Sequence, residues 1–201
     1  MTTIIYYLLA AVAAVIAVIA HEAARGLASA ALGDGSPKRN RRLGVKLSHI
    51  DPLGLIMFVI FGYGWSNPVN TSAIYYKNRK AGTILVHTIP SVVNLLIGVI
   101  FACASNLVSL VPNYDAALIL YSLSHTVARV NIAFAIFNII PIYPLDGAKI
   151  LSLFLSPNAN VNVMRYEKIL QIILVVALMF GVFATVITPL ANVIINSLIF
   201  I

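Results

Sequence analysis

Long apolar stretches alternate along the chain with short polar segments. Three of them, within residues 1–32, 81–111 and 116–145, are long enough for a helix to cross a bilayer. The first ends at a Gly-Asp-Gly sequence, and a short turn-forming segment joins the other two. The pattern predicts three membrane-spanning helices, with the third returning across the bilayer after the second.

A shorter apolar stretch, from Pro52 to Trp65, lies within residues 33–80 between two basic segments. Its length of about 14 residues is too short for a comfortable span and suits a re-entrant or interfacial segment. If it crossed the bilayer, the basic segments would lie on opposite sides, against the tendency of basic loops to remain cytoplasmic. We therefore expect the chain to turn back here and to leave the membrane on the side where it entered.

The C-terminal hydrophobic segment, residues 166–201, is too long for one straight span. Its uncharged part, residues 169–201, would form a helix of about 50 Å, whereas the hydrocarbon core of a bilayer is about 30 Å thick. We expect a break near Pro189. Because the chain shows no internal repeat and no soluble segment, residues 1–201 are predicted to form a single membrane domain.

Composition agrees with this assignment. The chain is 61% hydrophobic and 9% charged, with a mean hydropathy of +0.98, which excludes a water-soluble globule and a disordered chain. The net charge of +7 comes largely from the segments on either side of the short apolar stretch. We expect an integral membrane protein of a prokaryotic plasma membrane, with its basic loops in the cytoplasm. No nucleic-acid motif accompanies the basic residues, so we expect no nucleic-acid partner.

Polar groups within spans are costly and are therefore candidates for function. His21 and Glu22 interrupt the first apolar stretch, and Asp146 follows the end of the stretch at 116–145. With the basic loops inside, both stretches run from outside to inside, so these groups approach the same half of the bilayer. A histidine and an aspartate that meet there could share a divalent metal.

Three stretches resemble the site-2 protease family of intramembrane zinc metalloproteases, in its minimal-core form. They are His21-Glu22 with Gly26 and Leu32–Asp34, then Arg42–Gly44 with His49–Gly54, and finally Phe137–Gly147. The last is close to the family pattern Asn-x-x-Pro-x-x-Pro-Leu-Asp-Gly. The resemblance implies an all-α polytopic membrane protein with a core of about five to six membrane segments. It also implies a short re-entrant or strand-forming linker.

The resemblance further implies residue roles and a substrate. His21 and Asp146 would be zinc ligands, and Glu22 would be the general base for a zinc-bound water. Asn138 would be a further catalytic-site residue that holds the substrate or orients the acidic end. The substrate would be a helix embedded in the lipid bilayer, and the reaction would be hydrolysis of one of its peptide bonds.

The sequence departs from the family at Arg25, where the second zinc-ligand histidine is expected. A guanidinium has no acceptor lone pair and cannot ligate zinc. Arg25 shares a helix face with His21 and Glu22 and can form an ion pair with Glu22 or Asp146, which favours a metal-free site. A replacement ligand would have to be another histidine, and His87 is better placed for this than His49 or His125. The plainer interpretation is structural: His87 and His125 would line helix interfaces, and His49 would lie in the linker as a capping or strand residue.

Three functions therefore remain open. The first is a zinc-dependent endopeptidase that cleaves membrane-embedded helices. The second is a non-catalytic pseudoprotease that binds or regulates membrane proteins, with zinc absent or weakly bound. The third, which explains the Phe137–Gly147 stretch least well, is a small transporter that uses the buried polar groups.

Overall fold

The computed structural model describes residues 3–199, and within that range it contains helices and loops but no strand. Three helices are long and apolar enough to cross a membrane, and a bent pair near the C-terminus could form a fourth span. The prediction of an all-α polytopic membrane protein is therefore confirmed. The helical elements are α1 (Thr3–Ala31), α2 (Ser36–Arg39), η1 (Leu47–His49), α3 (Pro52–Phe61), η2 (Ala73–Tyr75), α4 (Arg79–Ser105), η3 (Asn106–Leu110), α5 (Tyr114–Ile139), α6 (Asp146–Ser152), α7 (Pro157–Arg165), α8 (Glu167–Met179) and α9 (Ala184–Asn196).

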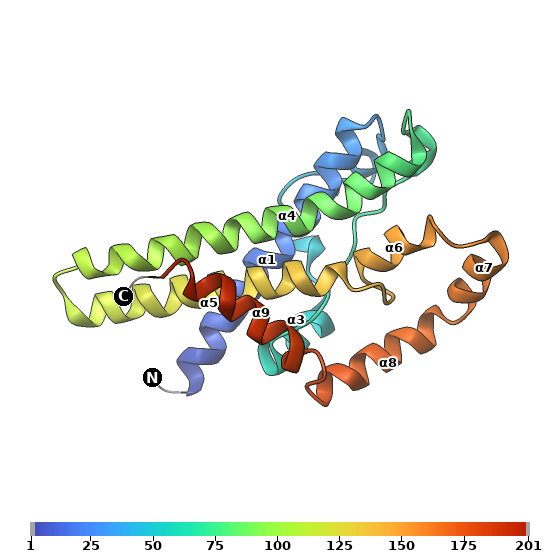
Figure 1. Cartoon of the computed structure of the whole chain (residues 1–201). Coiled ribbons are helices and arrows are strands. Elements are labelled where there is room, and N and C mark those ends of the chain that lie inside the picture. Colours follow the sequence, from blue (N-terminus) through green and yellow to red (C-terminus); the bar gives the residue numbers. More distant parts are fainter. Residues whose placement is uncertain (1–2, 200–201) are drawn as a thin grey trace.

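The helices α4 and α5 form an antiparallel hairpin, and α1 packs against both of them (Figure 1). Small side chains on α1 allow this close packing, because Ala13, Ala14 and Ala17 are fully buried at the contact with the neighbouring helices. The apolar core continues from this bundle to α3 and to the inner faces of α8 and α9.

The chain that leaves α3 returns to the residues that precede this helix. Asp51 caps its first turn by accepting a hydrogen bond from the Gly54 amide at 2.8 Å. After the helix, the chain returns, and the Asn67 amide donates to the His49 carbonyl oxygen at 2.8 Å. The Arg42 guanidinium donates to the carbonyl oxygens of Ser48 (2.8 Å) and Asn67 (2.7 Å). The chain therefore turns back after α3, as expected of a re-entrant segment. No strand forms in this linker of the described chain.

A buried carboxylate fixes the loop that follows α1. Asp34 accepts hydrogen bonds from the Ser36 amide (2.8 Å), the Ser72 amide (2.7 Å) and the Ser29 hydroxyl (2.8 Å). Burial by itself would raise the pKa of Asp34, but these hydrogen bonds outweigh it and hold the pKa below its ordinary value. Asp34 thereby joins the end of α1 to the segment that leads into α4.

The C-terminal helices depart from the predicted break point. The chain bends by 68° between α8 and α9, at residues 180–183, whereas the sequence predicted a break near Pro189. Pro189 lies inside α9, where a proline removes one hydrogen bond without ending the helix. Gly181 has a φ of +69°, in the left-handed region that interrupts a helix. The glycine therefore ends α8, and the prediction from proline alone was wrong.

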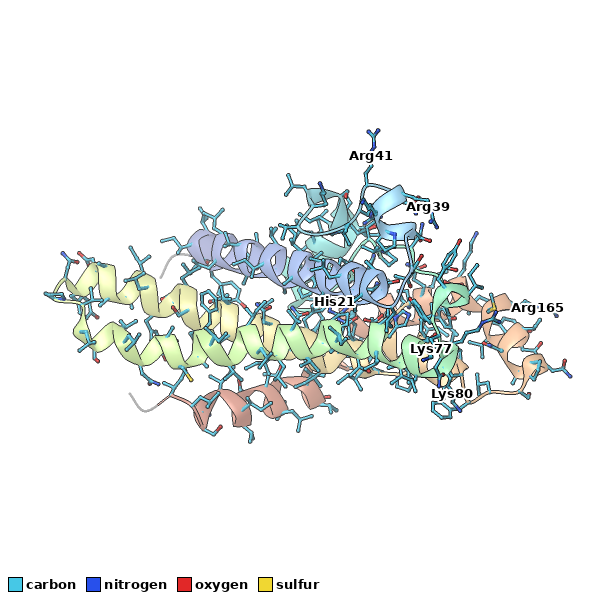
Figure 2. All side chains as sticks on the ribbon, turned by 90° about the horizontal axis from the view of Figure 1, so that it is seen from above. His21, Arg39, Arg41, Lys77, Lys80 and Arg165 are labelled. Carbon is cyan, nitrogen blue, oxygen red and sulfur yellow. The ribbon has the colours of Figure 1, made fainter. Side chains whose placement is uncertain are left out.

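The basic side chains gather at one end of the bundle. In Figure 2, Arg39, Arg41, Lys77, Lys80 and Arg165 all lie at the end where α1 finishes and α4 begins, opposite the α4–α5 turn. His21 lies deeper in the bundle than these cations. The chain thus has one strongly basic end, on the side where α3 enters and leaves.

Candidate functional site

His21 faces a buried polar cluster from the middle of the α1–α4–α5 bundle. Its Nδ1 lies 2.8 Å from Asn94 Oδ1, and its Nε2 lies 2.9 Å from Asp146 Oδ2. The Asn94 amide nitrogen donates to the Ala17 carbonyl oxygen and to Asn131 Oδ1, so the Asn94 oxygen is the acceptor for the imidazole. Nδ1 is therefore protonated, and Nε2 is the nitrogen that faces the cluster.

Arg25 follows one helical turn after His21 and occupies the centre of the cluster. Its Nη2 donates to Asp146 Oδ1 at 2.6 Å and lies 3.1 Å from His21 Nε2. Its Nη1 lies 2.8 Å from Glu22 Oε1 and donates to Glu22 Oε2 at 3.0 Å. All four side chains are buried. One guanidinium thus bridges two carboxylates that come from different helices.

Glu22 is also held by the segment that follows α3. Its Oε1 accepts a hydrogen bond from the Ser66 hydroxyl at 2.5 Å, and its Oε2 accepts one from the Val69 amide at 2.8 Å. With the contacts from Arg25, both carboxylate oxygens are engaged. The re-entrant segment therefore positions the acid that the sequence singled out.

Asp146 is the first residue of α6 and closes the cluster from the opposite side to α1. Pro141 and Pro144 keep α5 from continuing, and an acid in the first turn of a helix is favoured by the helix dipole. Besides His21 and Arg25, a third group reaches Asp146, because His87 Nδ1 lies 2.7 Å from its Oδ1. The structure therefore brings His21, Glu22, Arg25, His87 and Asp146 together.

Asn138 stands apart from these five side chains. Its amide donates to the Phe134 carbonyl oxygen of its own helix at 3.0 Å, and it forms no hydrogen bond to the cluster within residues 3–199. Its expected catalytic role therefore remains a prediction.

The model of peptidase family M50 matches residues 3–182 of this chain. The chain belongs to peptidase family M50, the site-2 proteases. It is also 25% identical over 179 residues to a Bacillus subtilis (strain 168) protein named "Putative zinc metalloprotease YwhC", covering 86% of this chain and 80% of the relative. No solved structure gives a significant match. The family is one of intramembrane metalloproteases, and this chain is accordingly an integral membrane protein.

The M50 resemblance implied zinc, but the donor set does not fit that metal. A catalytic zinc site needs three protein ligands and an open position. Within the described part of the chain, no group of three His, Cys, Asp or Glu side chains is arranged to hold a metal ion. The Arg25 guanidinium contacts both His21 Nε2 and Asp146 Oδ1, so its positive charge lies next to the two expected zinc ligands. A dication placed there would be repelled by it.

The other histidines of this M50 chain do not reach the cluster. His49 lies in the linker, with its Nε2 2.8 Å from the Gly44 carbonyl oxygen. His125 stacks on Tyr121 with ring centroids 5.6 Å apart. Of the three histidines weighed as replacement ligands, only His87 contacts Asp146.

Asn94, Ser66 and Val69 had no role assigned from the sequence. An asparagine inside an uncharged span is a usable signal, because a buried amide needs partners. Ser66 and Val69 offer no such signal, since their contribution depends on the path of the returning chain and, for Val69, on a backbone amide. The structure was needed to find them.

A cavity of about 370 Å³ adjoins the cluster on the side of the basic end. Arg25, His87 and Asp146 form one wall, and Val69, Tyr143 and Lys149 contribute to the others. The cluster of this M50 chain is therefore buried on the bundle side and faces a space that could receive part of a polypeptide.

Proposed function

We propose that this M50 chain binds membrane-embedded polypeptide segments at the cavity beside Arg25 and does not hydrolyse them with zinc. One observation carries the proposal: Arg25 Nη2 lies 2.6 Å from Asp146 Oδ1 and 3.1 Å from His21 Nε2. In this arrangement, the guanidinium supplies the positive charge that the buried carboxylates require.

The engagement of Glu22 supports the same proposal. A general base needs a free lone pair near the water that it activates. Both Glu22 oxygens already accept hydrogen bonds, from Arg25, Ser66 and Val69. Glu22 therefore acts as a structural counter-ion that ties α1 to the re-entrant segment.

A zinc-dependent endopeptidase is the second candidate, and one contact favours it. His87 Nδ1 lies 2.7 Å from Asp146 Oδ1, so His21, His87 and Asp146 could form a three-ligand set if Arg25 moved away. Glu22 would then be released for the role that the family resemblance implies, with Asn138 beside the substrate.

Metal content separates the two candidates. The proposal expects far less than one zinc per chain in protein purified after growth with zinc, and a rise towards about one in Arg25→His, which restores a third donor. His125→Gln is the matched control, because it removes a histidine outside the cluster. About one zinc per wild-type chain, lost in His87→Ala, would establish the second candidate and overturn the first.

We also propose that the basic end faces the cytoplasm of a prokaryotic cell and that the chain lies in the plasma membrane. The gathering of lysines and arginines at one end supports this orientation (Figure 2). It places the cavity beside Arg25 in the cytoplasmic half of the bilayer.

A further inference from the structure

We propose that Arg129 binds the carboxylate of an acidic residue in the middle of a partner's transmembrane helix. This inference rests on the proposed function, because it names the chemistry of the membrane segment that the chain binds. It concerns a second cavity, which shares no lining residue with the one beside Arg25.

Arg129 is a charge in the middle of a spanning helix. At a rise of 1.5 Å per residue, it lies about 22 Å from the start of α5 and about 15 Å from its end. A charge at this depth is costly unless it is paired. No Asp or Glu side chain within residues 3–199 forms an ion pair with Arg129, and Asp115 on the same helix is about 21 Å away along the axis. The described chain thus leaves this cation without an anionic partner.

The cavity around Arg129 has a volume of about 300 Å³ and lies between α1, α3, α5 and α9. Its polar lining includes the His125 ring and the hydroxyls of Tyr63, Thr126 and Thr188, while Phe58 and several alanines supply the apolar remainder. The Tyr63 hydroxyl lies 2.9 Å from Thr188 Oγ1, which holds the tip of the re-entrant segment against α9. Arg129 itself is exposed, so an incoming anion can reach its guanidinium.

The geometry favours a single carboxylate over a larger anion. A planar guanidinium binds a carboxylate through two parallel hydrogen bonds. A volume of about 300 Å³ accommodates a side chain and excludes a whole helix, which is about 10 Å wide. A partner helix would therefore lie against the mouth of the cavity and insert one side chain.

Depth favours a protein carboxylate over a lipid headgroup. Lipid phosphates lie at the edges of a hydrocarbon core about 30 Å thick, whereas Arg129 is near the middle of its helix. A headgroup would have to be drawn well into the hydrocarbon to reach Arg129. An Asp or Glu in the middle of a transmembrane helix is already at this depth and needs a cation.

The test uses the full chain in phosphatidylcholine vesicles and two synthetic transmembrane peptides of leucine and alanine. One peptide carries a central Glu and the other a central Gln, and binding is measured by energy transfer between labels. We expect the Glu peptide to bind about tenfold more tightly or better, as for a charged hydrogen bond shielded from water. Arg129→Gln should abolish the preference, and Arg129→Lys should retain part of it. Arg165→Gln, at an exposed position on α7, is the matched control and should retain all of it.

The outcomes distinguish this inference from the proposed function. Equal binding of the two peptides, or an undiminished preference in Arg129→Gln, would overturn the Arg129 site and leave the proposed function standing. Failure of both peptides to bind would overturn the Arg129 site, whereas the zinc contents of wild type and Arg25→His decide the proposed function separately. If phosphatidylglycerol in equal parts with phosphatidylcholine, or added oleate, removed the Glu preference by competition, the site would belong to a lipid anion and the partner helix would be excluded.

Discussion

Arg25 changes the chemistry of its site because a guanidinium keeps its proton under all conditions in a protein. It satisfies two buried carboxylates at once, and removal of one partner from such a network leaves an uncompensated charge. A neutral histidine at the same position would leave both acids in need of a metal. Under the proposed function, Arg25 therefore both replaces an expected zinc ligand and supplies the positive charge that zinc would otherwise provide.

This argument predicts a large loss of stability in Arg25→Met. The free energy of unfolding should fall by about 3–5 kcal/mol, because Glu22 and Asp146 remain buried without their cation. Denaturant unfolding in detergent measures the change. Arg165→Met, at an exposed position, should stay within about 0.5 kcal/mol of wild type. Addition of Asp146→Asn to Arg25→Met should recover part of the loss, and unaltered stability in Arg25→Met would show that Arg25 is not the counter-ion.

The residue-level site was only partly readable from the sequence. His21, Glu22 and Asp146 stood out because polar groups in apolar stretches are costly, and Arg25 stood out because it could not do what the family pattern requires. The contacts of Glu22 with Ser66 and Val69 could not be foreseen. They depend on where a loop passes in space, and no residue type or spacing records that position.

At the level of the elements, Asp34 joins the end of α1 to the segment before α4, and its stabilising effect depends on pH. Its pKa in the folded chain lies below the ordinary value of about 3.9. The stabilisation is therefore complete well above that value and is lost as pH falls through the folded pKa. The difference in unfolding midpoint between wild type and Asp34→Asn should be constant near neutral pH and should shrink below about pH 4. A difference that did not change between neutral and acid pH would contradict the role of the ionised carboxylate.

The bend between α8 and α9 gives a prediction that compares two residues. Gly181→Ala should destabilise the fold by about 1 kcal/mol, because a side chain is strained at a φ of +69°. A Cβ at Gly181 would meet no atom within 4 Å, so the cost is conformational and involves no steric clash. Pro189→Ala should leave stability unchanged or raise it, since α9 continues through this position. Thermal unfolding of the two variants decides between them. A larger loss of stability in Pro189→Ala than in Gly181→Ala would indicate that the proline, and not the glycine, determines the bend.

The spanning helices were predictable because the bilayer imposes a length that apolar stretches must match. The return of the chain after α3 agrees with the short apolar stretch between two basic segments, and its re-entrant position in the membrane stays a prediction. The break at 180–183 was not, because glycine and proline both interrupt helices and their relative effect depends on the backbone conformation that packing selects.

For the molecule as a whole, orientation links the two proposed binding sites. The cavity beside Arg25 lies towards the basic end, and the cavity around Arg129 lies between the tip of α3 and the first turns of α1. Of the long helices, α1 lines both cavities, through Tyr6 and Ala10 at one and Arg25 at the other. The sidedness of the basic end therefore determines which half of a partner helix faces Arg25.

Labelling of single cysteines tests this sidedness. The variants carry Cys103→Ser and one new cysteine in place of Lys46, Lys77 or Tyr114. All three positions are exposed. Lys46 and Lys77 lie outside the helical spans, and Tyr114 is the first residue of α5. A membrane-impermeant thiol reagent should label positions 46 and 77 only in inverted vesicles of a bacterial host, because basic loops remain cytoplasmic. Position 114, in the turn at the opposite end, should be labelled only in right-side-out vesicles. Labelling of positions 46 and 77 from opposite sides would mean that α3 crosses the membrane. Labelling of both positions from outside would show that the orientation is the reverse of the one proposed, with the Arg25 cavity in the outer half of the bilayer.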